Sequence, residues 1–180
     1  MEERLKKLDD LNKKLKPPKE LGGKFLPEEL PKQFNFMFIA EMPSMKIPKD
    51  WDGKSNYNFG KFNARCKFFQ EMMIKYGVAG SYATDIVKKR DAPGKPKKEE
   101  IRQWLPFLLE EIRIIQPKSI IVLGERTYEE SFKPLVLPFI PKEIEVNYVF
   151  HYSSQVPRVK FEQRFAEIIK ETKKSNPPSS

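Results

Sequence analysis

The chain has 180 residues and a mass of 21.2 kDa, the size of one domain, and its 39% apolar and 33% charged residues are typical of a globular protein. A single cysteine, Cys66, excludes a disulfide framework and a zinc or iron–sulfur site built from several cysteines. The net charge of +9 favours a polyanionic partner, although a lysine-rich solvated surface explains the charge equally well.

Residues 1–33 differ in pattern from the rest of the chain. Leucines at helical spacing predict a basic helix over residues 2–15, which ends before Pro17 and Pro18. A connector rich in proline and glycine follows over residues 16–33. We expect this helix to be an appendage to the domain that follows.

From residue 34 to 172, short apolar runs alternate with apolar residues at helical spacing. The runs predict strands at 34–40, 81–87, 119–123 and 145–150, and the helical spacing predicts helices at 61–76, 99–115, 126–132 and 161–170. Residues 173–180 form a polar tail. This alternation is typical of an α/β fold, here three α/β/α layers around a short central four-stranded parallel sheet. Ligands of such sheets bind beyond the carboxyl ends of the strands.

No apolar run approaches the length of about 20 residues that a membrane-spanning helix needs. The charged N-terminus contains no apolar signal core. We therefore expect a soluble, intracellular protein that does not contact a membrane.

Motifs at the predicted strand ends resemble those of the uracil-DNA glycosylase superfamily, most closely its bacterial and archaeal branch related to the iron–sulfur enzymes. Residues 40–44 (AEMPS) resemble Gly-Glu-Ala-Pro-Gly, and residues 84–90 (TDIVKKR) resemble Thr-Asn-x-Val-Lys-Cys-Arg. Residues 116–124 (QPKSIIVLG) match x-Pro-Lys-x-Ile-x-x-Leu-Gly, and residues 151–153 (HYS) resemble His-Pro-Ser. The order and spacing agree over residues 34–170.

The resemblance implies a monofunctional DNA glycosylase of base-excision repair, which hydrolyses the N-glycosidic bond of a flipped uracil or other deaminated or modified base. His151 would stabilise the departing base through a hydrogen bond to its carbonyl oxygen. Glu41 would position water or offset positive charge on the sugar. Phe59, in residues 57–60 (YNFG), would stack on the extruded base.

Asp85 stands where the family has an asparagine that contacts the edge of the base. An ionised carboxylate offers only hydrogen-bond acceptors and would repel O4 of uracil. Three interpretations stay open: a protonated Asp85 that mimics the amide, a carboxylate that accepts from an exocyclic amine of another base, or a side chain that points elsewhere.

Other residues of the same motifs are expected to contact the DNA backbone or to depart from the family pattern. Lys88, Lys89, Arg90, Ser153 and Arg158 are the predicted backbone contacts. Lys89 stands where a cluster cysteine would be, so no iron–sulfur cluster or other metal is expected. Met42 occupies the place of a catalytic Asp or Asn in other branches.

The expected partner is DNA, bound by a monomer in the cytoplasm or at the nucleoid. Hydrolysis needs only water, so we expect no cofactor. A non-catalytic nucleic-acid-binding module on the same fold is the alternative, because the first motif is degraded at Met42.

Overall fold

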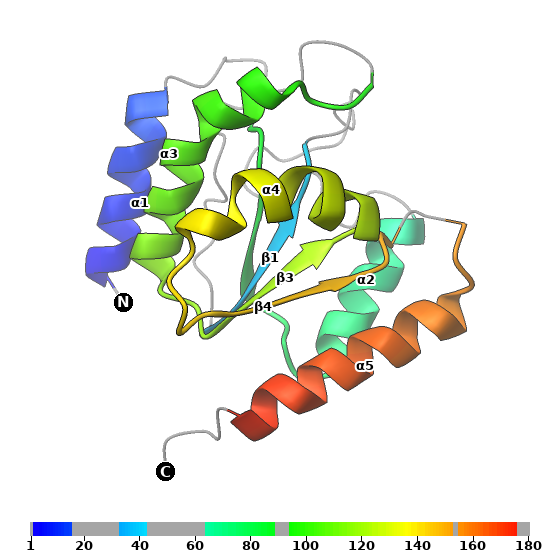
Figure 1. Ribbon diagram of the computed structural model, residues 1–180. Helices are drawn as coiled ribbons and strands as arrows, with labels where there is room; N and C mark the ends of the chain where they lie inside the picture. The colour runs from blue at the N-terminus through cyan, green and yellow to red at the C-terminus, as the bar shows by residue number, and fades with distance from the viewer. Residues whose placement is uncertain (1, 16–32, 43–63, 89–93, 153–154, 176–180) are drawn as a thin grey trace.

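Four parallel strands form one sheet at the centre of the molecule (Figure 1). The structure is a computed structural model and describes residues 2–15, 33–42, 64–88, 94–152 and 155–175. The strands are β1 (Gln33–Ala40), β2 (Ser81–Asp85), β3 (Ser119–Leu123) and β4 (Glu145–Val149), in the spatial order β2-β1-β3-β4. The predicted four-stranded parallel sheet is confirmed.

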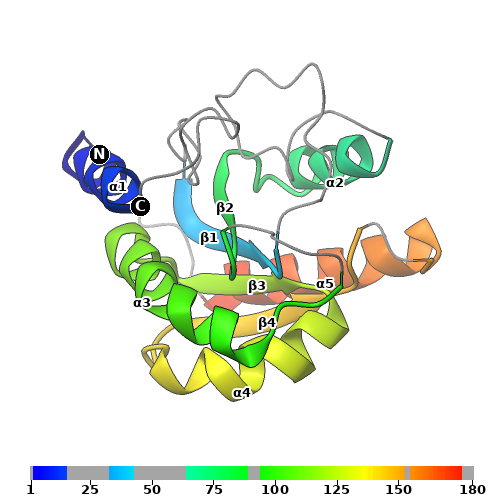
Figure 2. The ribbon, with the colours of Figure 1, turned by 90° about the horizontal axis from the view of Figure 1, so that it is seen from above.

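Helices cover both faces of the sheet and complete the three predicted layers (Figure 2). The first face carries α1 (Glu2–Leu15), α3 (Lys98–Ile115) and the helical segment after β3, which comprises η2 (Thr127–Phe132), α4 (Lys133–Leu135) and η3 (Leu137–Phe139). The second face carries α2 (Ala64–Lys75) and α5 (Arg158–Ser175).

Alternate residues of the two central strands point to opposite faces of the sheet. Met37 and Ile120 belong to the apolar cluster under α3, whereas Phe38 and Ile121 belong to the cluster under α2 and α5. Every residue of β3 is buried. A strand covered on both faces is mostly apolar, which is why β1 and β3 contain the continuous apolar runs of residues 36–40 and 120–123.

The N-terminal helix is part of the folded core, so the expectation that it is an appendage is wrong. Leu8 and Leu11 are buried in the cluster that also contains residues of α3. Arg4 donates to the carbonyl oxygen of Ile115 over 3.2 Å and to Oε1 of Gln116 over 2.8 Å, at the end of α3. Helix α1 therefore packs beside α3 and belongs to the same helical layer on the first face of the sheet.

Two other elements differ from the sequence prediction in their extent. Helix α5 runs from Arg158 to Ser175, so it includes the first residues of the predicted polar tail. The strand predicted over 81–87 ends at Asp85, and the next two amides still bond to the chain of β1, from Ile86 to Ala40 over 2.8 Å and from Val87 to Glu41 over 3.1 Å.

Candidate active site

The strand register brings the predicted site residues to one edge of the sheet. Ala40 of β1 pairs with Asp85 of β2, and Leu123 of β3 pairs with Val149 of β4. Because the strands are parallel, the residues that follow them emerge together, and these include Glu41 and His151. This edge therefore brings Glu41, Asp85 and His151, the only histidine of the chain, to the same side of the sheet.

Glu41 is held at both oxygens by the helical segment after β3. Its Oε1 accepts a hydrogen bond of 3.0 Å from the Ser131 hydroxyl, and its Oε2 lies 3.2 Å from Nη2 of Arg126. The Glu41 side chain is 12% exposed. Each carboxylate oxygen has a further lone pair, so this oriented group retains the capacity to accept from water or substrate.

Gly124 brings the start of that helical segment close to His151. Its φ of +113° lies in a region that residues with a side chain rarely adopt. A Cβ at this position would meet Oγ1 of Thr127 at 3.0 Å and Cβ of His151 at 3.6 Å. The turn after β3 thus packs between the two predicted catalytic residues, Glu41 on one side and His151 on the other.

The His151 ring stacks on Tyr152, which in turn stacks on a ring of the core. Its centroid lies 4.6 Å from that of Tyr152 with an interplanar angle of 23°, and Tyr152 lies 5.1 Å from Phe69 at 22°. Phe69 in turn contacts Phe38 edge to face at 5.5 Å, within the core. The orientation of the imidazole is therefore linked through aromatic contacts to the rigid centre of the sheet.

Tyr152, which stands where the family has a proline, is partly buried and lies within the electrostatic influence of Asp85. Burial raises the pKa of its hydroxyl well above the usual value, and the nearby Cys66 thiol and Asp85 carboxylate raise the pKa further. Asp85 itself is buried. The hydroxyl of Tyr152 thus lies near the predicted base-recognition residue while its ring packs on the predicted leaving-group residue.

Lys88 lies in the interior, so the prediction that it contacts DNA phosphates is wrong. Its ammonium group forms a salt bridge with Glu111 of α3, and the two side chains are 1% and 0% exposed. The same ammonium donates to Oγ1 of Thr84 over 2.7 Å and to the backbone carbonyl of Asp85. A lysine buried beside a carboxylate is satisfied within the protein and leaves no charge for a phosphate.

Glu111 completes this network on its other oxygen. Its Oε1 accepts from the Tyr82 hydroxyl over 2.7 Å and from the Thr84 hydroxyl over 2.9 Å. Burial and the charge of Glu111 raise the pKa of Tyr82 well above its usual value. Hydrogen bonds from Tyr82 and Thr84 of β2 to Glu111 therefore link β2 to α3 within an otherwise apolar layer.

Most of the remaining predicted contacts cannot be placed. Phe59, Lys89, Arg90 and Ser153 lie outside the described residues. Arg158 is exposed at the start of α5, with its guanidinium 4.9 Å from the centre of the Phe68 ring. Its position on the surface is compatible with a contact to the DNA backbone.

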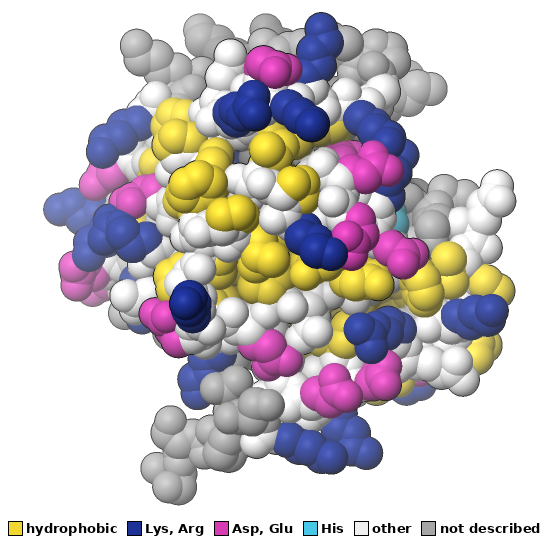
Figure 3. Space-filling view, viewed as in Figure 1, with side chains coloured by type: hydrophobic (Ala, Val, Ile, Leu, Met, Phe, Trp, Pro, Cys, Tyr) yellow, Lys and Arg dark blue, Asp and Glu magenta, His cyan; other side chains and the backbone are white. Residues whose placement is uncertain are grey.

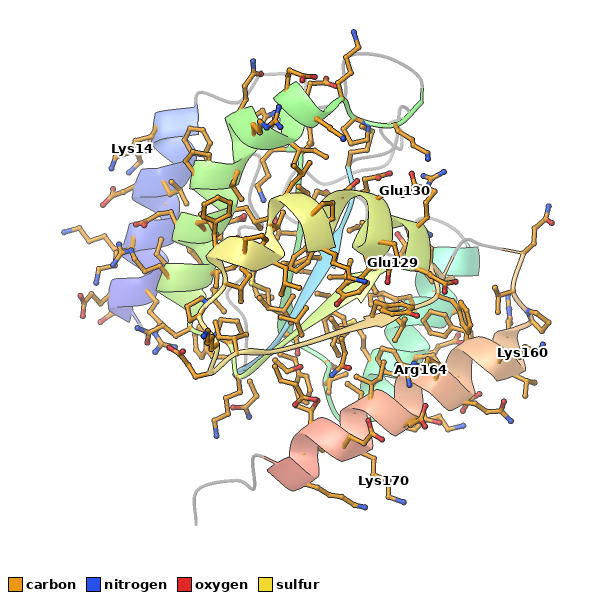
Figure 4. All side chains as sticks on the ribbon, in the orientation of Figure 1. Lys14, Glu129, Glu130, Lys160, Arg164 and Lys170 are labelled. Carbon is orange, nitrogen blue, oxygen red and sulfur yellow. The ribbon has the colours of Figure 1, made fainter. Side chains whose placement is uncertain are left out.

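Figure 3 shows one face of the molecule, on which basic side chains alternate with acidic ones and form no continuous stripe. A shallow hollow of about 500 Å³ lies near the end of β4, beside Phe150, the residue before His151. Lys160, Gln163, Arg164 and Glu167 of α5 line it, and Figure 4 labels the lysine and the arginine.

Among the described residues no helix is long and apolar enough to cross a membrane. No group of three or more histidine, cysteine or acidic side chains in this part of the chain is placed to hold a metal ion.

Sequence reasoning missed Arg126, Ser131 and Glu111. One signal for Glu111 was present, since it interrupts the inward-facing apolar stripe of α3 beside Leu108 and Ile112. No local signal marks Arg126 and Ser131, because their contact with Glu41 spans 85 and 90 residues.

Comparison with known proteins gives a family assignment. No curated protein matches the chain. The family model of the uracil DNA glycosylase superfamily matches residues 27–173, which include the four described strands, α2, α3, the helical segment after β3 and most of α5. With this match over most of its length, the chain belongs to the uracil-DNA glycosylase superfamily.

Proposed function

We propose that the protein is a DNA glycosylase of base-excision repair that hydrolyses the N-glycosidic bond of a flipped uracil or another deaminated or modified base. The observation that carries the proposal is the placement of Glu41 and His151 at one sheet edge, on either side of the turn at Gly124. Both are presented by strands of the rigid sheet, as catalysis by positioned groups requires.

In the proposed reaction the C–N bond between the sugar and the base breaks first, and its electron pair leaves with the base. His151 donates a hydrogen bond to the carbonyl oxygen of the base, where negative charge develops. The sugar becomes cation-like, and the Glu41 carboxylate offsets this charge and directs water to the anomeric carbon. The water oxygen forms the new bond, and its proton balances the departing base.

Asp85 and Phe59 are proposed to select the base. Phe59 would stack on the flipped base, and Asp85 would contact its hydrogen-bonding edge. The position of Asp85 at the end of β2, on the same sheet edge as Glu41 and His151, supports a recognition site there. Two chemistries fit an acidic group there: a protonated carboxyl that donates to O4 of uracil, or a carboxylate that accepts from an exocyclic amine.

Contacts to the DNA backbone are proposed for Lys89, Arg90, Ser153 and Arg158. Lys160 and Arg164 are further candidates, because they line the hollow next to the loop that carries His151. Affinity that rests on such contacts falls steeply as salt rises.

The test is a panel of single-lesion oligonucleotides containing uracil, hypoxanthine, xanthine or mismatched bases, scored for alkali-labile breaks. We expect excision of at least one base, with single-turnover rates lower by about a hundredfold or more in His151→Ala and Glu41→Gln. DNA affinity should stay close to that of the unmodified protein. Glu110→Gln is the matched control, since Glu110 forms a comparable pair with Arg113 on α3.

Salt-dependent binding without excision of any base would refute the proposal and support the alternative, a non-catalytic DNA-binding module. The observation in favour of that alternative is that Met42, in the first motif, packs against the apolar cluster under α3. Wild-type rates in both active-site variants would refute the roles given to Glu41 and His151 even if the protein excises bases.

A further inference from the structure

The helical segment after β3 changes its hydrogen-bond register as it passes Glu41. At its start, the amide of Tyr128 bonds to the carbonyl of Gly124, four residues earlier, over 2.9 Å. At the end of η2, the amide of Lys133 bonds to the carbonyl of Tyr128, five residues earlier. Residues Thr127–Phe132 thus form a π-helical turn, a rare geometry that is frequent at functional sites.

This turn explains how Arg126 and Ser131 reach the same carboxylate. In an α-helix, residues advance by about 100° each, so two positions five apart point about 140° away from one another. In a π-helical turn the hydrogen-bond register is five residues, so positions five apart lie close to one above the other. Both side chains then face Glu41, one at each oxygen.

We infer that Arg126 and Ser131 are positioning residues for Glu41 and that the π-helical turn exists to bring them together on this carboxylate. The inference rests on the proposed function and adds a supporting pair to it. Ser131, which is 5% exposed, donates its single hydroxyl proton to Oε1 and fixes the rotation of the carboxylate. Arg126, which is 56% exposed, holds Oε2 from the solvent side.

Ser131 is the more informative of the two in an experiment. Loss of an exposed arginine changes the attraction of the protein for DNA as well as its contact with Glu41. Ser131→Ala removes one buried oxygen and leaves the net charge unchanged. Its effect on Glu41 can therefore be separated from any effect on DNA binding.

The experiment is a double-mutant cycle on the single-turnover excision rate, with Ser131→Ala, Glu41→Gln and the double variant. We expect Ser131→Ala to lower the rate by about tenfold and to change the dissociation constant for DNA by less than about twofold. In the Glu41→Gln background the same substitution should change the rate by less than about twofold, because the carboxylate that it positions is already gone.

Ser119→Ala is the matched control. Its hydroxyl is also buried and belongs to β3, and it makes no hydrogen bond to any described residue. We expect this variant to excise at the wild-type rate. An equal loss of rate in Ser119→Ala and Ser131→Ala would show a general effect of core substitution and would overturn the inference.

Two further outcomes separate the inference from the proposed function. If Glu41→Gln is impaired but Ser131→Ala has the wild-type rate, or lowers the rate equally in both backgrounds, the inference falls and the function stands. If Glu41→Gln excises at the wild-type rate, the catalytic role of Glu41 falls, and the inference falls with it. Urea unfolding of the wild type, Ser131→Ala, Glu41→Ala and their double variant measures the Ser131–Glu41 contact without reference to activity, because alanine leaves no acceptor for the Ser131 hydroxyl. Additive effects on stability would also overturn the inference.

Discussion

The buried pair of Lys88 and Glu111 offers the sharpest test of how this fold is held together. In Lys88→Met the side chain keeps its approximate length but loses its charge. Among the described residues, the Glu111 carboxylate then retains the hydroxyls of Tyr82 and Thr84 as its donors, in a site where its side chain is 0% exposed. A buried ion that loses its counterion is among the most destabilising changes known in proteins.

The expected magnitude follows from this burial. Removing one member of a buried pair costs about 3–5 kcal/mol, against a total free energy of unfolding of about 5–15 kcal/mol for a domain. Lys88→Met should therefore remove about a fifth or more of the free energy of unfolding. In Lys88→Met/Glu111→Gln the unpaired charge is absent, and the amide oxygen still accepts from the two hydroxyls. This double variant should recover more than half of the loss.

The assay is urea unfolding followed by far-ultraviolet circular dichroism, with the slope of the transition compared among variants. Lys133→Met is the matched control, because Lys133 forms an exposed pair with Glu129 one helical turn away, and its midpoint should equal that of the wild type. A loss below about 1 kcal/mol in Lys88→Met, or additive losses in the double variant, would refute the reasoning.

Three other changes test separate parts of the structure. Burial keeps the pKa of Tyr82 and Tyr152 well above the usual value of about 10, so these hydroxyls lose their protons at lower pH in the unfolded chain than in the folded one. The stability that the two groups contribute is therefore present below about pH 10 and should fall as the pH rises further. Ionisation of all six tyrosines without unfolding would contradict this. Gly124→Ala should lower the free energy of unfolding by about 1–3 kcal/mol, because its φ is +113° and the added Cβ would lie only 3.0 Å from Oγ1 of Thr127. An unchanged urea midpoint would show that the turn relaxes freely. Leu8→Ala should lower the free energy of unfolding by about 2–5 kcal/mol in the same assay. An unchanged free energy would show that α1 is an appendage after all.

The fold was largely predictable because its strands are covered on both faces. Continuous apolar runs such as the one in β3 have few other uses in a chain of this size, and alternation with helices selects a parallel sheet. The same topology allowed Glu41 and His151 to be assigned to one edge of the sheet before any coordinates were known. Their catalytic roles, like the contacts of Phe59, remain predictions.

The features that the sequence did not predict arise mostly from contacts between residues that lie far apart in the chain. Lys88 begins a run of basic residues, and such runs are usually solvated, but its partner Glu111 lies 23 residues away on another element. The π-helical turn is a change of backbone hydrogen-bond register, and no motif in residues 127–132 (TYEESF) indicated it. The amphipathic pattern of α1 predicted a helix but could not identify α3 as the surface that buries it.

The strand order also has a consequence for how the chain folds. The two central strands, β1 and β3, are hydrogen-bonded neighbours, yet their partner residues Phe36 and Ser119 are separated by about 80 positions. The centre of the sheet can form only after the ends of this long loop meet, and chains dominated by such distant pairings fold slowly. Until then the apolar edge of β3 is unpaired, which makes the interval before closure the period in which the chain is most exposed to aggregation.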